Sequence, residues 1–121
     1  MAAGTEYTDA LITCDADRDL IERILTEHSR IPFSYGDVRM ELAFDRVRDH
    51  YLLLILGWQG HQRMNGSLIH VDLKDGKFWI EYDGTEEGIA TDLLEAGIPK
   101  DRIVLAFKPM SRRKYSEFAV G

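Results

Sequence analysis

The stretch VRMELAFDRVRDHYLLLILGW, residues 38–58, decides the fold of this chain. In residues 38–46 apolar and charged side chains alternate, which predicts a β-strand with one buried and one solvent-facing side. Residues 50–58 form an unbroken apolar run, which predicts a central strand covered on both faces. The short turn VRD between the two runs predicts that the strands pair as neighbours.

Three further strands are predicted outward from this pair. SLIHVDL, residues 67–73, is followed by the tight turn KDG and then by KFWIEYD, residues 77–83. Four strands joined by short turns form an antiparallel meander. DRIVLAF, residues 101–107, predicts a fifth strand, and residues 108–121 form a basic turn with a short apolar tail.

Two helices are predicted around the meander. In residues 15–32 apolar side chains recur at helical spacing, in the set Leu20, Ile21, Ile24, Leu25 and His28. Asp15 or Asp17 can serve as the N-cap, and Pro32 ends the helix. The second helix ends at GIP, residues 97–99. This order predicts an α+β fold: N-terminal helix, four-strand meander, second helix, further strand and C-terminal tail, with both helices on one face.

Length and composition narrow the class of protein. The chain has 121 residues, so we expect a variable lead-in, residues 1–16, and a single domain, residues 17–121. The net charge of −6 argues against a broad surface for nucleic-acid phosphates. Cys14 is the single cysteine, so a reducing cytoplasm is expected. The longest apolar run, residues 51–58, is too short to span a membrane, and no membrane association is expected.

The acidic stretch IEYDGTEEGIATDLLEAGIP, residues 80–99, raises the question of catalysis. Its spacing favours a helix start, with Asp83 or Thr85 as the cap and Glu86 completing a capping-box-like pair. Asp92 and Glu95 are expected to face water. A metal-dependent nuclease could use Asp72, Glu81 and Asp83, but such sites place a lysine where this chain has Asp83.

The histidines and Cys14 predict neither a metal site nor a cofactor. His70 and Asp72 are two apart on a strand and share a face, which favours a surface His–Asp pair. No H-x-x-x-H or C-x-x-C spacing is present, and zinc needs three or four ligands. Cys14 lies in the lead-in, which favours an incidental thiol over a nucleophile.

Two features indicate interaction with other molecules. Arg112, Arg113, Lys114 and Tyr115 form a basic patch that could contact a partner protein or a phosphate backbone, or could be a solvated turn. Phe78 and Trp79 are neighbours on one strand and cannot face the same layer. One of them therefore lies on the second sheet face, where an apolar patch would favour a partner, a homodimer or a higher oligomer.

Three segments together resemble the XisI family, the fdxN element excision controlling factors. They are ILTEHSRIPFSYGDVRMELAFDRVRDHYLLLILGW (24–58), GSLIHVDLKDGKFWIEYDGTEEGIATDLLEAGIPKDRIVLAF (66–107) and RRKYSEFAVG (112–121). The resemblance runs from about Asp17 to the end of the chain and does not include residues 1–16. Family-like motif positions of unknown role are Tyr35, Gly36, Asp37, Asp83, Gly84, Thr85 and Gly88.

The resemblance implies a role in the programmed excision of a DNA element that interrupts nitrogen-fixation genes. Recombination there belongs to a separate recombinase, and the resemblance implies a XisH-like partner and no catalytic residues. We therefore expect a non-enzymatic accessory factor whose contact with DNA is indirect or weak. The alternatives are direct DNA binding through residues 112–114 and the metal-dependent nuclease.

Overall fold

A single five-stranded sheet forms the body of the protein. The computed structural model describes the backbone of residues 2–31 and 36–121, and side chains from residue 15 onward within these ranges. The strands lie in the order β1 (Asp37–Asp45), β2 (His50–Gln59), β3 (Gln62–Lys74), β4 (Lys77–Asp83) and β5 (Ile103–Leu105). The first three pairings are antiparallel, which confirms the meander, and β5 pairs parallel to β4. The fold is α+β with a mixed sheet.

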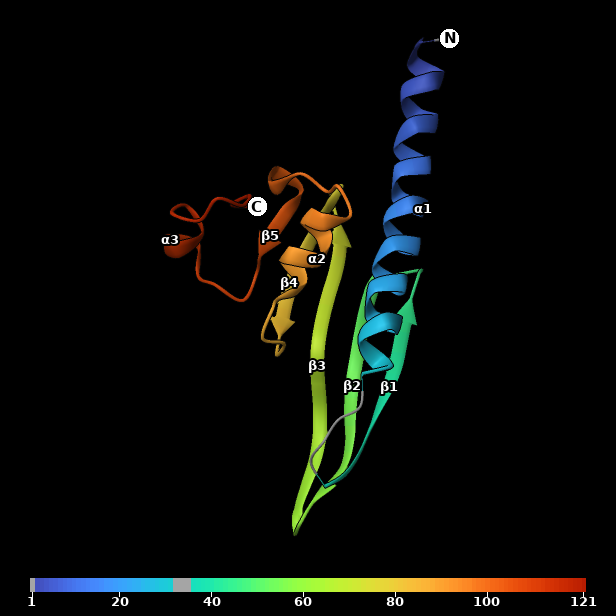
Figure 1. Cartoon of the computed structure of the whole chain (residues 1–121). Coiled ribbons are helices and arrows are strands. Elements are labelled where there is room, and N and C mark those ends of the chain that lie inside the picture. The colour runs from blue at the N-terminus through green and yellow to red at the C-terminus, as the bar shows by residue number, and fades with distance from the viewer. Residues whose placement is uncertain (1, 32–35) are drawn as a thin grey trace.

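The two longer helices share one face of this sheet. They are α1 (Ala2–Ser29) and α2 (Ile89–Glu95), and two short helical turns follow, η1 (Lys100–Arg102) and α3 (Met110–Arg113). α1 lies along β1 and β2, while α2 lies over β4 and β3 (Figure 1). The prediction that both helices pack on one face is confirmed, because side chains of both belong to one buried cluster with the strand residues.

The helix-facing side of the sheet carries the core. α1 contributes Ile21, Ile24 and Leu25, and α2 contributes Ile89 and Leu93, all at most 4% exposed. This confirms the apolar stripe predicted for the first helix. The strands contribute Tyr51, Leu53, Ile69, Val71, Phe78, Ile80, Ile103 and Leu105.

The start of α1 differs from the prediction. The helix begins at Ala2, so Asp15 and Asp17 lie inside it and are not its N-cap. Their carboxylates have ionic partners instead, Arg18 for Asp15 and Arg102 for Asp17. Residues 2–14 contain no proline that would stop the helix. α1 therefore runs continuously across the expected boundary between residues 16 and 17.

Among the residues that the structure describes, β2 is covered by helices on one face only, contrary to the prediction. Tyr51 and Leu53 are fully buried beneath the helices. Leu52 and Leu54 point to the opposite face and are only half-buried. The unbroken apolar run gave the wrong prediction of two covered faces, because one face of β2 carries apolar side chains that neither α1 nor α2 covers. This second face of the sheet is called the outer face below.

α1 is held to the turn between β1 and β2 by a charged contact. The Arg18 guanidinium donates two hydrogen bonds to the Asp49 carboxylate, with N···O distances of 2.8 and 3.2 Å. The Tyr51 hydroxyl donates a third at 2.8 Å. These contacts, with Arg18 foremost, lower the pKa of Asp49 below its usual 3.8. Burial, in turn, raises the pKa of Tyr51.

The lowered pKa of Asp49 makes the stability depend on pH. A carboxyl whose pKa is lower in the folded state stabilises the fold above its unfolded pKa, and that contribution is lost as pH falls through the folded pKa. We expect Asp49→Asn to be less stable than the wild type at pH 7 and to approach it below about pH 4. Urea unfolding from pH 3 to pH 7 in EDTA buffer measures this, with exposed Asp101→Asn as the control. An equal stability gap at both ends of the range would contradict it.

In the described part of the chain, no helix is long and apolar enough to cross a membrane.

Candidate functional site

His50, His70 and Asp72 come together on the outer face. Along β2 and β3 the side chains alternate, and Tyr51, Ile69 and Val71 are the fully buried members beneath the helices. His50, His70 and Asp72 occupy the intervening positions and therefore point the other way. His50 is paired with Asp72 across the two strands.

A β-bulge in β3 creates this arrangement. Leu54 pairs with Ser67 but Leu53 pairs with Ile69, so Leu68 has no partner residue on β2. If the register of residues 54–59 continued unbroken, His50 would pair with Val71, and Asp72 would lie on the opposite face of the sheet from His50. The bulge shifts the register by one residue and so brings His50 and Asp72 to the same side.

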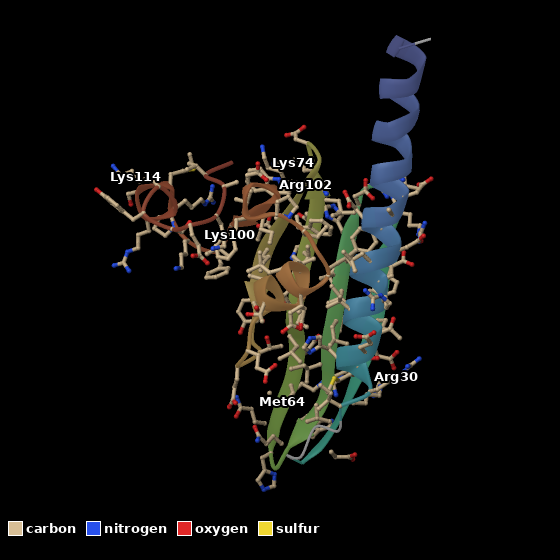
Figure 2. All side chains as sticks on the ribbon, turned by 45° about the horizontal axis from the view of Figure 1, so that its top comes forward. Arg30, Met64, Lys74, Lys100, Arg102 and Lys114 are labelled. Carbon is tan, nitrogen blue, oxygen red and sulfur yellow. The ribbon has the colours of Figure 1, made fainter. Side chains whose placement is uncertain are left out.

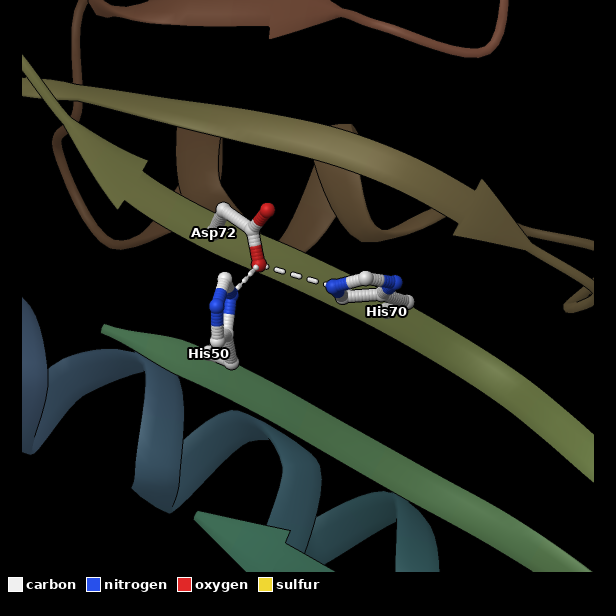
Figure 3. Close-up of side chains that lie close together, drawn as sticks. All are labelled: His50, His70 and Asp72. Carbon is white, nitrogen blue, oxygen red and sulfur yellow. Dashed lines mark hydrogen bonds and ion pairs between the residues drawn. The ribbon is translucent and has the colours of Figure 1, made fainter. Parts of the chain in front are cut away.

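Both imidazoles bind the same oxygen of Asp72. His50 Nδ1 and His70 Nε2 each lie 2.7 Å from Asp72 Oδ1 (Figure 3). The two rings meet edge to face, with centroids 6.1 Å apart. The hydrogen bond to Asp72, and then its negative charge, raise the pKa of His50 above its usual value. The group is partly open to solvent, with side-chain exposures of 45% for His50, 28% for His70 and 21% for Asp72.

The prediction of a His70–Asp72 pair is confirmed, but the sequence interpretation missed His50. The sequence feature that could have indicated His50 is the predicted hairpin, because His50 is the first residue of β2 and Asp72 lies near the end of the antiparallel strand β3. A regular hairpin register gives the wrong partner, and only the bulge at Leu68 corrects it. No local sequence pattern marks the position of that bulge.

Apolar side chains continue along β2 on the outer face. The β2 strip, as we name it, consists of Leu52, Leu54, Leu56 and Trp58. The leucines are half-buried and Trp58 is 50% exposed. The Arg63 guanidinium lies 5.5 Å from the Trp58 ring centroid. A row of this kind beside polar groups is typical of a protein–protein contact surface.

Phe78 and Trp79 divide between the two faces as predicted. Phe78 is fully buried in the core, and Trp79 lies on the outer face, only half-buried. The Trp79 indole N–H donates to the carbonyl of Lys74, and the Lys74 ammonium lies 4.1 Å from its ring centroid. Residues near the end of the chain approach the same ring, with Arg113 5.9 Å away. Trp79 is therefore partly covered by its own chain.

Arg113 secures the C-terminal segment. Its guanidinium donates hydrogen bonds to the carbonyls of Lys108 and Ala106 at 2.8 and 3.0 Å, and to that of Val120 at 3.4 Å. The segment then runs beside β5, where the Ala119 N–H donates to the Ile103 carbonyl at 2.9 Å. Arg113 thus has a structural role that the run of basic residues did not indicate.

The rest of the predicted basic patch is exposed. Arg112 and Lys114 are exposed, and Tyr115 is 83% exposed. Lys114 projects from α3 away from the sheet (Figure 2). Its ammonium lies 5.2 Å from the Tyr115 ring centroid. The structure leaves these three side chains available for contact and separates them from Arg113.

The acidic stretch builds a loop before α2. α2 begins at Ile89 rather than near Thr85, so the predicted capping box with Glu86 is wrong. Asp83 Oδ1 accepts hydrogen bonds from the Thr85 N–H and hydroxyl at 2.9 and 2.6 Å, and Oδ2 accepts from the Ile89 N–H at 2.7 Å. The Thr85 hydroxyl oxygen also accepts from the Gly88 N–H at 3.2 Å. Asp83 therefore stabilises the helix start from six residues away.

Replacement of Asp83 measures how much the hydrogen bonds of this loop contribute to the free energy of unfolding. We expect Asp83→Ala to lower the free energy of unfolding by about 2 kcal/mol, because three hydrogen bonds to a charged group are lost. Glu87→Ala, an exposed acid of the same loop, should change it by less than about 0.5 kcal/mol. Urea unfolding followed by circular dichroism compares the two. Equal losses of stability in Asp83→Ala and Glu87→Ala would contradict the conclusion that Asp83 stabilises the start of α2.

The remaining family-like positions have backbone roles. Gly88 has φ +88° just before α2, a conformation that favours glycine. The Gly84 N–H donates to the Leu68 carbonyl at 2.8 Å. Gly36 has φ +64°, and a Cβ there would meet the Trp58 carbonyl oxygen at 2.7 Å. Asp37 opens β1 opposite Trp58. Tyr35 lies outside the described residues.

The other acidic residues do not assemble a nuclease site. Asp72 is on the outer face, whereas Asp83 pairs with Ile69, which faces the core, and binds its own loop. Glu81 lies at the β3–β4 irregularity between paired residues. Asp92 does not simply face water, because His28 Nε2 lies 2.7 Å from its Oδ2 and joins α1 to α2.

Comparison with known proteins gives the class of this protein. The model of the XisI family, described as XisI protein, matches residues 12–120. The chain therefore belongs to the XisI family. The match begins at Ile12, inside α1, and so includes part of the expected lead-in.

Two solved structures from Anabaena variabilis are similar along nearly their whole length. One is a XisI-like protein, with 32% identity, a TM-score of 0.83, and coverage of 89% of this chain and 99% of that chain. The other is the fdxN element excision controlling factor XisI, with 34% identity, a TM-score of 0.79, and coverage of 90% and 99%. No curated protein matches this chain.

Proposed function

We propose that this protein is a non-catalytic accessory factor that controls programmed excision of a DNA element interrupting nitrogen-fixation genes. The similarity to an fdxN element excision controlling factor, over 99% of that chain, carries the proposal. The scattered positions of Asp72, Glu81 and Asp83 support a regulatory role over a hydrolytic one. In a host that contains such an element, deletion of the gene should abolish excision, measured by amplification across the rejoined ends. Unchanged excision would overturn this role.

We further propose that the protein acts by binding a XisH-like partner through the outer face. The β2 strip offers half-buried leucines and an exposed tryptophan, and tryptophan is among the side chains that contribute most to interfaces. The net charge of −6 would complement a basic partner and speed encounter. These features support contact with a protein more than contact with nucleic-acid phosphates.

Co-purification with the XisH-like protein encoded nearby tests the partner. We expect a complex at micromolar concentrations, and Leu54→Glu in the β2 strip should weaken it at least about tenfold by placing a charge in an apolar contact. Thr91→Glu adds the same charge on exposed α2 and should leave the complex intact. No complex, or equal behaviour of the two variants, would contradict the proposed interface.

Direct DNA contact is proposed to be weak or indirect. Arg113 is engaged with backbone carbonyls, so Arg112 and Lys114 are the exposed cations of the basic segment. A mobility-shift titration with increasing salt is expected to show little binding by the isolated protein. Tight binding that falls steeply with salt, and that is lost in Arg112→Ala with Lys114→Ala, would establish direct DNA binding instead.

A further inference from the structure

We propose that His50 Nδ1, His70 Nε2 and a carboxylate oxygen of Asp72 form a binding site for a divalent transition-metal ion of the zinc type. The three donor atoms lie within 4.8 Å of one another on the outer face. The site adjoins one end of the β2 strip, because His70 pairs with Leu52, but none of its three donors belongs to that strip.

The distances suit such an ion after a small adjustment. Zinc binds imidazole nitrogen and carboxylate oxygen at about 2.0–2.2 Å, so tetrahedral donors stand about 3.4 Å apart. Each imidazole nitrogen now lies 2.7 Å from Asp72 Oδ1. An increase of less than about 1 Å in each of these two nitrogen–oxygen distances would make room for the ion. Partly exposed side chains can make that movement by rotation alone.

The three donors lie on two paired strands above a packed core. His70 and Asp72 are at alternate positions of β3, and His50 is directly paired with Asp72 on β2. The intervening Tyr51 and Val71 are fully buried in the core. Donors on paired strands over a packed core are held near one another at little entropic cost, which is the arrangement that favours binding.

The donor set selects the kind of ion. Two imidazoles with one carboxylate suit Zn²⁺, Co²⁺ or Ni²⁺, whereas Mg²⁺ and Ca²⁺ prefer oxygen ligands alone. Three protein ligands leave a fourth position open, as in zinc sites that also bind water or another ligand. The 45% exposure of the His50 side chain provides access from solvent.

The described part of the chain contains an internal comparison. His28 and Asp92 also form a His–carboxylate pair at 2.7 Å, between α1 and α2. No third donor of the metal-binding types joins them, since the cluster of His50, His70 and Asp72 is the only group of three among the described residues. If zinc bound to any His–Asp pair, it would also bind at His28. If zinc needs the three-donor cluster, His28 should not bind it.

Calorimetric titration of the full chain with ZnCl₂ tests the site. Cys14→Ser should be the background, so that the thiol does not bind the ion. We expect one Zn²⁺ per chain, with affinity reduced at least about tenfold in each of His50→Gln, His70→Gln and Asp72→Asn. His61→Gln, in the turn between β2 and β3, should bind like the background protein. Absence of binding in large molar excess, or equal affinity in all variants, would overturn the proposal.

A measurement on the unsubstituted chain does not depend on the folding of these variants. The chain has four histidines, and their imidazole NMR signals can be followed as Zn²⁺ is added. The signals of His50 and His70 should shift together and reach saturation at one equivalent, while those of His28 and His61 stay in place. Saturable shifts at His28 or His61 instead would place the ion elsewhere and refute the assignment.

Discussion

Gly57→Ala is expected to lower the free energy of unfolding by about 3–5 kcal/mol, or to prevent folding, because it adds backbone strain to a steric clash. Gly57 lies in β2 opposite Val38 of β1 and has φ +144°, where side chains are rarely found. An added Cβ would stand 2.1 Å from the Asp37 carbonyl oxygen and 2.8 Å from Val38 Cα. Both are backbone atoms, so no side-chain rotation can relieve the contact.

Two other glycines separate the causes of this effect. Gly60 has φ +64° but open space around an added Cβ, so Gly60→Ala should cost only the backbone strain, about 1–2 kcal/mol. Gly66 has neither the conformation nor close neighbours, so Gly66→Ala should change stability by less than about 1 kcal/mol. Urea unfolding followed by tryptophan fluorescence compares the three. A cost for Gly57→Ala no greater than for Gly60→Ala would exclude the steric explanation.

Arg102→Ala is expected to lower the free energy of unfolding by about 3 kcal/mol, because it leaves the buried Asp17 carboxylate without its partner. Asp17 is 5% exposed, and Arg102 binds it from η1. The Arg102 Nε also donates to the Gly76 carbonyl at 2.9 Å. One side chain thus connects α1, the β3–β4 turn and η1, and Lys74 lies near it at the same end of the fold (Figure 2).

The sign of the pH effect distinguishes this explanation from simple loss of packing. Burial raises the pKa of Asp17, and the Arg102 charge opposes that rise. Removal of Arg102 should raise the pKa further, so the variant should lose less stability at pH 4 than at pH 7, because protonation removes the unpaired buried charge. The double variant Asp17→Leu with Arg102→Met should recover most of the loss, since an apolar pair can replace a buried ion pair.

Lys100→Ala is the matched control for Arg102→Ala. Lys100 is also a cation of η1, but its pair with Glu117 is exposed, so its removal should cost less than about 1 kcal/mol. A similar loss for both variants, independent of pH, would mean that the buried Asp17 carboxylate is not the cause.

Local sequence patterns predicted the elements better than their ends and directions. Alternation located β1, and helical spacing identified Ile21, Ile24 and Leu25 as core residues. The pattern within residues 101–107 does not indicate the direction of β5. The order of elements does, because α2 lies between β4 and β5 in the chain and a helical crossover is the usual connection of parallel strands. The start of α1 was missed because cap residues are a local signal, and both candidates have ionic partners.

The candidate site and two structural contacts depend on residues that are distant in the sequence, and local sequence patterns do not show such pairings. Arg102 reaches Asp17 across 85 positions of the chain, and nothing near either residue marks that pairing. His50 joins His70 and Asp72 only through the bulge at Leu68. Arg113 belonged to a visible run of basic residues, yet its hydrogen bonds to carbonyls follow from how the last residues pack.

The pairing of Ala119 beside β5 makes the two edges of the sheet unequal. Ala119 bridges Val104 and occupies hydrogen-bonding positions on that side, whereas β1 has a neighbouring strand on one side only within the described residues. A strand from another molecule could therefore extend the sheet beside β1, or beside residues 62–68 of β3, which have no partner on β4. The last residues of the chain close the sheet beside β5. Without them, the short strand β5 would offer a further open edge, and an open edge invites strand addition from another molecule.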